Sequence, residues 1–528
     1  MRFGVRIFPY SHRSLAWALC ISVSMLLLVA SETYSLSSTS VLQHQREAKK
    51  LVREARKQTR AGLFEKSETT LRRALELDEL RSETRVELAF VLTKLRRIRE
   101  AYDLVFPVAE SEPKNARAYA VLGTTMLTAG RFKEARIFFH QAIRINRRED
   151  LAWAGYGTVD FYENRISESL ANLREATFHQ PDEPDHLFTL AQVSARAELY
   201  DDAAYAYTRF LQVSKATDAD RRARIKGLIE FLRFLGKTGT LYQTIGAEQT
   251  EVNFDLEGNR PVISLRLDDH PQPLRFVLDT GSGISVLSEK TAKRLKIKPI
   301  TRGGHARCLG GDGKFEIVYG LLREIGIGKI GVRNVPVYIR KFHDSAREVD
   351  GYIGLSLISK FLTTVDYGRQ TFNLTRRDED NRAFRQNPES SFPLRLTSSG
   401  FLSGEVSLDG FDIPLNFIVD TGASVSVISD ELSRTEAISP FGLKNKMRVV
   451  GSAGITDNVP SFLLPRVAIG GHSRADITAV ALDLGIINEA SGFEQAGILG
   501  GNFLNNYRVT FDFRNSRVTL VPVRTEKD

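Results

Sequence analysis

Apolar and polar positions along the chain follow two different periods, which divide it into two parts. Between residues 46 and 215, small residues return every 34 positions and the apolar residues around them have helical spacing. From about residue 250 to residue 525, short alternating apolar runs are separated by Gly, Asp and Asn, which is typical of strands and turns. The pattern therefore predicts an all-α part followed by an all-β part.

The helical part has the period of a stacked repeat. Small residues at two fixed points of a repeat allow the two helices of a hairpin to approach closely. The pattern resembles the tetratricopeptide repeat, with about five copies over residues 46–217. This resemblance implies a superhelix whose concave face binds a protein partner or a peptide. Two series of small or modest residues step by 34: Ala55, Ala89, Gly123, Gly157 and Ala191, and Ala74, Val108, Ala142 and Ala176.

One more amphipathic helix is expected over residues 218–236, directly after the repeats. Its apolar residues have helical spacing, and Gly236 and Gly239 mark its end. We expect this helix to cap the stack.

One stretch of the β part occurs twice. In each copy an apolar, β-branched run breaks at Asp-Thr-Gly and then resumes, first at Asp279 and again at Asp420, which is 141 positions later (420 minus 279). The likeness extends beyond the stretch, because a later apolar-Gly motif also recurs, with Gly354 and Gly500 as its glycines. The β part is therefore expected to contain two copies of one lobe.

These paired motifs resemble those of an aspartic peptidase built from two retropepsin-like lobes fused in tandem, here residues 251–376 and 396–525. The resemblance implies a catalytic dyad of Asp279 and Asp420, one from each lobe. The fold class predicted for the whole chain is multidomain, an all-α tetratricopeptide-repeat superhelix followed by an all-β bilobal aspartic-peptidase domain.

Peptide hydrolysis by this route uses a water held between two carboxylates that share one proton. By the same resemblance, the hydroxyls of Thr280 and Thr421 tie the two turns across the lobe interface. Gly281 and Gly422 keep side chains away from the bound water.

The two copies differ at the next position, where Ser282 stands against Ala423. A serine hydroxyl can donate a hydrogen bond to Asp279 and favour its ionised form, which alanine cannot do. We hypothesise that Asp420 then carries the shared proton more often.

Each lobe also has a glycine-rich segment between its aspartate and its second motif. These segments have the composition of hairpin tips that close over a substrate, and an inert surface hairpin is the alternative. The candidate flap residues are Gly310, Gly311 and Gly313 in the first lobe, and Gly451 and Gly454 in the second.

The N-terminus has the layout of a targeting segment. Arg2, Arg6 and Arg13 precede an apolar stretch over residues 15–30, and small polar residues follow. Residues 1–35 are therefore predicted to be a secretory signal, and an uncleaved N-terminal membrane anchor is the alternative. Either interpretation predicts an exported protein, periplasmic or secreted.

Net charge and the spacing of histidines and cysteines argue against several other classes of function. The 528 residues carry a net charge of +9 without a long Lys/Arg block, so nucleic-acid binding is not expected. The nine histidines lack metal-binding spacing, so neither a metal nor a cofactor is expected. Cys308 follows His305 by three residues, but no feature of a catalytic thiol is visible there. The other cysteine, Cys20, lies in the leading segment, so a disulfide in the exported part is not expected.

Together these features predict an exported aspartic endopeptidase whose helical repeats recruit protein partners or substrate. The alternative is a non-catalytic repeat scaffold whose peptidase-like lobes bind peptides without cutting them. Two assemblies of the lobes stay open, one within a single chain and one across a dimer.

Overall fold

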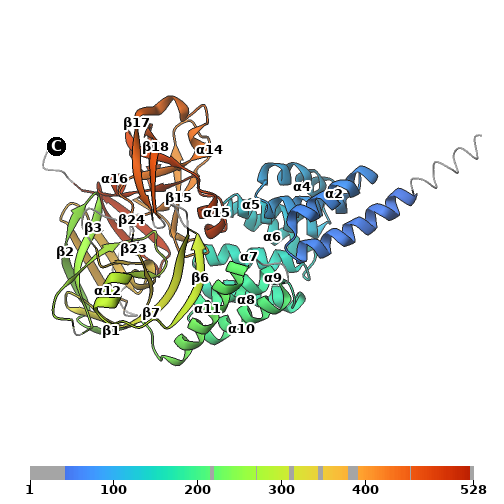
Figure 1. Cartoon of the computed structure of the whole chain (residues 1–528). Helices are drawn as coiled ribbons and strands as arrows, with labels where there is room; N and C mark the ends of the chain where they lie inside the picture. Colours follow the sequence, from blue (N-terminus) through green and yellow to red (C-terminus); the bar gives the residue numbers. More distant parts are fainter. Residues whose placement is uncertain are drawn as a thin grey trace, which may run out of the picture.

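The computed structural model shows helices first and strands after them, as the two sequence patterns predict (Figure 1). It describes residues 42–214, 219–268, 270–307, 314–342, 349–377, 390–451 and 454–523. The segment predicted to be a signal or an anchor, residues 1–35, lies outside these ranges. Within them, the search for a helix long and apolar enough to span a membrane finds no candidate.

The helical part is a run of antiparallel hairpins with short connections. A helix over residues 42–60 comes first. The following helices are α2 (Phe64–Leu77), α3 (Ser82–Lys94), α4 (Ile98–Ser111), α5 (Ala116–Thr128), α6 (Phe132–Ile145), α7 (Asp150–Tyr162), α8 (Ile166–His179), α9 (Pro184–Arg196), α10 (Tyr200–Val213) and α11 (Ala219–Lys237).

The small residues that repeat every 34 positions are buried where the helices of a hairpin meet, which confirms the interpretation of the period. A Cβ atom on Gly123 would lie 2.7 Å from the ring of Phe139, and one on Gly157 would lie 3.0 Å from Cγ of Leu173. Distances this short leave no room for a side chain at either glycine. The packing of α5 on α6 and of α7 on α8 therefore depends on these positions.

A third 34-residue series, which the sequence patterns did not single out, marks the turn inside each hairpin. Each member is a residue with a left-handed backbone conformation, with φ between 61° and 76°. Because the turns are equivalent, they form one edge of the stack, called here the turn edge. Its residues are Gly62, Arg96, Gly130, Asn164 and Glu198.

The first lobe of the β part contains the strands that carry the first Asp-Thr-Gly turn. They are β1 (Gln243–Gly246), β2 (Gln249–Glu257), β3 (Arg260–Leu267), β4 (Leu274–Leu278), β5 (Ser285–Ser288), β6 (Thr301–Arg307), β7 (Lys314–Ile327), β8 (Ile330–Arg340), β9 (Gly351–Ile353), β10 (Phe361–Asp366) and β11 (Thr371–Arg376), with the short helices α12 (Glu289–Arg294) and α13 (Leu355–Ile358).

The second lobe repeats this order. Its elements are β12 (Ser391–Pro393), β13 (Arg395–Leu396), β14 (Leu402–Leu408), β15 (Leu415–Val419), β16 (Ser426–Ser429), α14 (Asp430–Ser433), η2 (Ser439–Phe441), β17 (Gly442–Gly451), β18 (Gly454–Leu464), β19 (Val467–Ile469), β20 (His472–Arg474), β21 (Ile477–Leu482), α15 (Gly485–Ser491), β22 (Gly497–Leu499), α16 (Gly501–Leu504), β23 (Tyr507–Asp512) and β24 (Arg517–Pro522).

Strand pairing shows that the lobes are copies of one fold. In the first lobe β4 pairs parallel with β9, and β5 pairs antiparallel with β9. In the second lobe β15 and β16 pair with β22 in the same two orientations. The second motif of each lobe, which the sequence placed around Gly354 and Gly500, therefore lies beside its own aspartate strand.

The lobes also share a sheet, because strands from the end of the chain return to the first lobe. β23 pairs antiparallel with β10, and β11 continues this sheet to β2. The Oγ1 atoms of Thr364 and Thr510 lie 2.9 Å apart across the β10–β23 pair. Backbone hydrogen bonds therefore join the two lobes of one chain.

The turn edge of the helical part is docked on the β part. Arg96 forms an ion pair with Glu494 at 2.7 Å, and Glu198 forms one with Lys360. Asn164 donates to the carbonyl of Phe513 at 3.1 Å. Successive repeats thus contact the peptidase-like lobes through equivalent positions.

Helix α11 lies against the first lobe as well as against the repeats. Ile225, Ile229 and Leu232 pack with the last hairpin. On another face of the helix, the ring of Phe231 stacks on Tyr319 of β7, with centroids 4.5 Å apart. The helix therefore joins the repeats to the first lobe instead of ending the stack in solvent.

Candidate active site

Each catalytic candidate lies at the end of a buried strand, where the neighbouring strand fixes its backbone. The N–H of Asp279 donates to the carbonyl of Ile353 at 3.0 Å, and that of Asp420 donates to the carbonyl of Leu499 at 2.9 Å. These acceptors belong to β9 and β22, the strands of the second motif. The same short strand therefore anchors the aspartate turn in both lobes.

The glycine of each second motif packs directly against the turn. A Cβ atom on Gly354 would lie 2.7 Å from the carbonyl carbon of Ile284, and one on Gly500 would lie 2.9 Å from that of Val425. Any side chain at either position would push the turn away, which is the physical reason for the recurring glycine.

The two threonines join the turns to each other through reciprocal hydrogen bonds. The hydroxyl of Thr280 donates to the carbonyl of Val419 at 2.7 Å, and that of Thr421 donates to the carbonyl of Leu278 at 2.7 Å. Each hydroxyl also accepts from the N–H of the other threonine, at 3.0 and 3.2 Å. Because all of these groups are buried, the turns are held face to face.

The two carboxylates meet over the glycines of the turns. The N–H of Gly281 donates to Oδ1 of Asp279 at 2.9 Å and to Oδ1 of Asp420 at 3.2 Å. The N–H of Gly422 donates to Oδ1 of Asp420 at 2.7 Å. A Cβ atom on Gly281 would lie 2.5 Å from Asp420, and one on Gly422 would lie 2.7 Å from Asp279. The structure thus brings Asp279 and Asp420 together within one chain.

The two aspartates are surrounded by different groups. Burial, and then the negative charge of Asp279, raise the pKa of Asp420 well above its usual range, against the N–H bonds from Gly422 and Gly281. The hydroxyl of Ser282 donates to Oδ2 of Asp279 at 2.7 Å, whereas Ala423 has no donor at the matching position. This arrangement agrees with a proton held on Asp420.

Two serines at the site were missed in the sequence analysis, although the repeat contained a signal for them. The hydroxyls of Ser285 and Ser426 accept from the N–H groups of Gly354 and Gly500, each at 3.1 Å. Both serines are buried, and they are 141 positions apart, the spacing of the aspartates. They connect each aspartate turn to its second motif.

Only the second of the two candidate flaps can be placed. Gly451 ends β17 and Gly454 begins β18, and the two residues face each other across the hairpin. In the first lobe, Gly310, Gly311 and Gly313 lie outside the described residues, as does Cys308. Their role as flaps stays a prediction.

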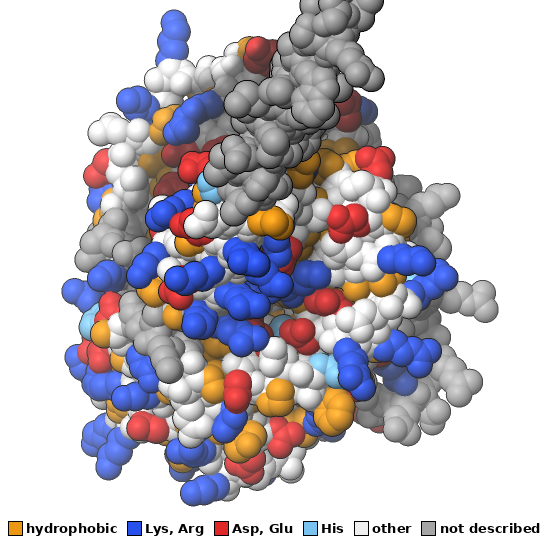
Figure 2. All heavy atoms as spheres, turned by 90° about the vertical axis from the view of Figure 1, so that its right-hand side faces the viewer, with side chains coloured by type: hydrophobic (Ala, Val, Ile, Leu, Met, Phe, Trp, Pro, Cys, Tyr) orange, Lys and Arg blue, Asp and Glu red, His pale blue; other side chains and the backbone are white. Residues whose placement is uncertain are grey.

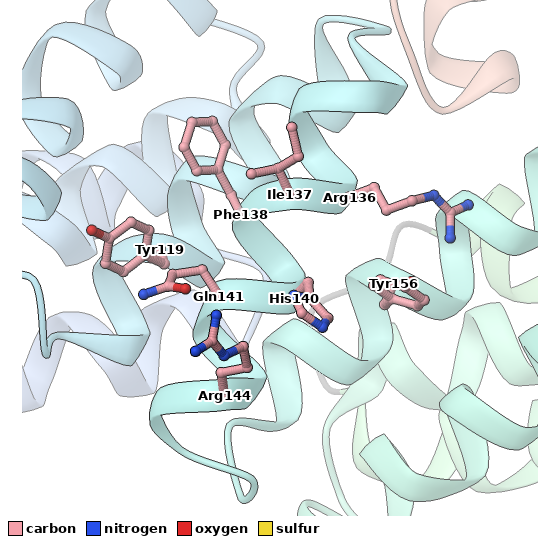
Figure 3. Close-up of a pocket in the computed structure, with 8 residues that line it drawn as sticks. All are labelled: Tyr119, Arg136, Ile137, Phe138, His140, Gln141, Arg144 and Tyr156. Atoms are coloured by element: carbon pink, nitrogen blue, oxygen red, sulfur yellow. The ribbon is translucent and has the colours of Figure 1, made fainter.

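A hollow on the helical part lies away from this site, between α5, α6 and α7 (Figure 3). Arg136 lies over the ring of Tyr156, 4.9 Å from its centroid. The other lining residues are Tyr119, Ile137, Phe138, His140, Gln141 and Arg144.

Two regions of the β part match a known protein family model. The aspartyl protease family model matches twice in tandem, over residues 263–357 and 404–503. Each match contains one Asp-Thr-Gly turn and the glycine of one second motif. The search of curated proteins finds no match.

The helical part is similar to solved tetratricopeptide-repeat (TPR) structures. A thermophilic TPR protein of Thermus thermophilus is 20% identical, with 34% of this chain and 98% of that chain covered and a TM-score of 0.30. PilF of Pseudomonas aeruginosa is 16% identical, with 37% and 88% covered and a TM-score of 0.28. YrrB, a TPR protein with an unusual peptide-binding site, is 18% identical, with 33% and 91% covered and a TM-score of 0.22.

Proposed function

We propose that this protein is an aspartic endopeptidase that hydrolyses peptide bonds with Asp279 and Asp420 as its catalytic dyad. One observation carries the proposal: both carboxylates accept a hydrogen bond from the same N–H, that of Gly281. Two carboxylates held this closely share one proton, because the ionisation of both is unfavourable.

In the first step of the proposed reaction, Asp279 accepts a proton from a water held between the carboxylates, and the water oxygen attacks the peptide carbonyl carbon. Asp420 gives its proton to the carbonyl oxygen, which forms a neutral tetrahedral diol. Asp279 then returns its proton to the amide nitrogen as the C–N bond breaks. Asp420 recovers a proton from one hydroxyl of the diol, and a carboxylic acid and an amine leave.

The substrate class proposed is an extended peptide or an unfolded segment of a protein. The hairpins β6–β7 and β17–β18 are the proposed flaps, which would hold the peptide by main-chain hydrogen bonds and leave its side chains to apolar pockets.

Export and recruitment complete the proposal. Residues 1–35 would direct the chain out of the cytoplasm as a secretory signal or a membrane anchor, to a periplasmic or secreted location. The helical repeats would recruit a protein partner or the substrate. Lys and Arg side chains gather near the centre of the face seen from the helical end (Figure 2), which supports a partner with acidic groups.

Ion pairs join residues of successive hairpins where such a partner could bind. Arg56 pairs with Glu83 and Glu87, each at 3.0 Å, and Arg117 pairs with Glu149 at 3.3 Å. A charged peptide bound along these helices would compete with the pairs.

The test is incubation of the full chain with a mixed peptide library from about pH 3 to about pH 8, beside Asp279→Asn. Cleavage by the unmutated chain and its loss in the variant are expected. Equal cleavage by both proteins, or none by the unmutated chain, would refute the enzymatic proposal. Peptides that bind without being cut would favour the scaffold alternative.

A further inference from the structure

Each catalytic turn is contacted by a tight turn from the other lobe, and the two contacts are equivalent. Gly283 and Ser424 are each four residues beyond their aspartate. Nδ2 of Asn259, in the β2–β3 turn, donates to the carbonyl of Ser424 at 3.1 Å. On the other side, the carbonyl oxygen of Ser399 lies so close to Gly283 that a Cβ atom there would be only 2.3 Å away.

Both contacting turns are held within the β part, and one of them is bonded to the helical part as well. Asn259 is held within the β part, where Nδ2 of Asn505 donates to its Oδ1 at 3.1 Å. The turn over residues 397–400, called here the support turn, is bonded within the β part from the N–H of Ser398 to the carbonyl of Ser491 at 3.0 Å. Oγ of Ser399 donates to the carbonyl of Ala490 at 2.9 Å, again within the β part. The support turn also receives hydrogen bonds from the helical part.

Arg196, at the end of α9, binds the support turn through its backbone. Nη2 of Arg196 donates to the carbonyl of Thr397 at 2.7 Å and to that of Ser398 at 3.4 Å. The hydroxyl of Tyr162 shares a hydrogen bond with Oγ of Ser398 at 3.0 Å. The guanidinium carbon of Arg196 lies 3.8 Å from the centroid of the Phe161 ring, so the planar group is held on one side by an aromatic face.

The hydrogen-bond acceptors of Arg196 among the described residues are carbonyl oxygens, and burial lowers its pKa to about 9. An arginine in such a position orients the backbone that it binds instead of neutralising the charge of a carboxylate. Beyond the support turn, the N–H of Leu402 donates to the carbonyl of Thr280 at 3.4 Å. The support turn therefore contacts the first catalytic turn at Gly283, and the residues that follow it contact the same turn at Thr280.

We propose that Arg196 of the helical part is a positioning residue of the active site, which acts through the support turn on the turn that carries Asp279. Among the described residues, the contact to the second catalytic turn comes from Asn259, which is held by Asn505 of the β part, so this contact does not pass through the helical part. The helical part would then be a component of the catalytic machinery of the first lobe, besides any role in recruitment. This inference rests on the proposed peptidase function only for its kinetic consequence.

The kinetic test compares the full chain with Arg196→Ala on the mixed peptide library and on a fluorogenic peptide chosen from the cleaved products. We expect kcat to fall about tenfold while KM changes less than about twofold, because a displaced catalytic turn lowers turnover more than binding. Arg196→Lys, which keeps a donor, should recover part of the loss. Arg209→Ala is the matched control, since Arg209 pairs with Asp182 at 2.7 Å on the same module and should leave kcat unchanged.

Hydrogen–deuterium exchange tests the same inference without requiring activity. Arg196→Ala should speed exchange in peptides over residues 279–284 and leave residues 420–424 unchanged, whereas a general loss of stability would affect both turns. Unchanged exchange and unchanged kcat would overturn the inference. If the unmutated chain cleaves no peptide, the proposed function fails, and the exchange comparison still decides whether Arg196 positions the turn. If Arg196→Ala does not fold, Arg196→Lys and Tyr162→Phe replace it in both measurements.

Discussion

The two lobes have the same aspartate turn but differ in the groups that surround it, and the difference shows that duplicated residues can lie in unlike environments. Asp279 accepts a hydrogen bond from Ser282, whereas the pKa of Asp420 is raised by burial and by the charge of its partner. In the proposed reaction these surroundings suit Asp279 to act as the base and Asp420 as the acid. The neighbouring groups, and not the residue type, then distinguish the two aspartates.

The long hairpins of the two lobes differ in the same way. In the first lobe, α11 runs along β6, where Nη1 of Arg224 donates to the carbonyl of His305 at 2.7 Å and Oγ1 of Thr301 donates to Glu230 at 2.7 Å. In the second lobe, most residues of β17 are exposed, and the β17–β18 hairpin rises away from the helices (Figure 1). The helical part thus supports the long hairpin of the first lobe, whereas β17 in the hairpin of the second lobe is mostly exposed.

The largest effect is expected from the aspartates, where the two lobes should be equally indispensable. Asp279→Asn and Asp420→Asn should each lower kcat/KM by about 10²–10⁴-fold, because each removes the acid or the base. Cleavage of a fluorogenic peptide measures this loss. Asp409→Asn, an exposed carboxylate paired with Arg466, is the control and should keep full activity. A tenfold or greater difference between the two variants would break the equivalence of the lobes.

The threonines test whether the lobe interface is as symmetric as the hydrogen bonds suggest. Thr280→Val or Thr421→Val removes a buried donor and leaves a carbonyl and an N–H unsatisfied, so each should lower the free energy of unfolding by about 1–3 kcal/mol. Urea unfolding measures the change. The exposed Thr69, whose hydroxyl donates to the carbonyl of Glu65, should tolerate valine. If only one threonine matters, the reciprocal network is not what joins the turns.

The contact between α11 and the first hairpin can be broken at Gly227. A Cβ atom there would lie 2.4 Å from the carbonyl oxygen of Arg302, so Gly227→Val should lower the free energy of unfolding by about 1–3 kcal/mol. At Gly442, in the hairpin of the second lobe, the nearest atom to a Cβ would be 3.5 Å away, and Gly442→Val should have little effect. Thermal unfolding of both variants makes the comparison. Equal decreases in the midpoint temperature would argue against a supporting role for α11.

The asymmetry of the aspartates can be tested further at Ser282, which stands against Ala423 in the second copy. Ser282→Ala removes a hydrogen bond to the ionised form of the dyad, so the acid limb of kcat/KM should move to higher pH by about one unit. The pH profile of peptide cleavage measures this shift. An unchanged acid limb would mean that Ser282 does not distinguish the lobes.

The smallest effect is on the pH dependence of stability. Because the pKa of Asp420 is raised in the folded protein, the native state keeps a proton that the unfolded chain has already lost. Stability should therefore fall as pH rises from the usual aspartate pKa of 3.8 through the raised value. Asp420→Asn cannot titrate, so its unfolding free energy should fall less over the same interval. The free energy of unfolding is measured with urea at each pH for both proteins. If it falls equally with pH in the two, Asp420 does not hold the proton.

Much of the fold and of the site was predictable because the information is periodic or duplicated. The 34-residue series placed the helix contacts at Gly123 and Gly157, and the repeated stretch identified both aspartates. The same 141-residue spacing contained Ser285 and Ser426, which were available to a closer comparison of the copies. Sequence periodicity could not show the bond between Arg196 and Thr397, because it joins residues 201 positions apart without a repeat on either side.

The sequence likewise left two assemblies of the lobes open, whereas the structure pairs the lobes within one chain. The pairing depends on the reciprocal bonds of Thr280 and Thr421 and on the β10–β23 strand pair. In the structure these contacts form within one chain, which folds back on itself. Local patterns therefore identify the halves of the site but not their partners.

The most direct test of the central claim, that two turns of one chain form one active site, is a mixture of the two inactive variants. Equal amounts of Asp279→Asn and Asp420→Asn are combined and assayed on the fluorogenic peptide beside the unmutated chain. If the dyad forms within one chain, the mixture should stay as inactive as either variant alone. Recovery of activity on mixing would show that lobes of different chains complete the site and would contradict the account.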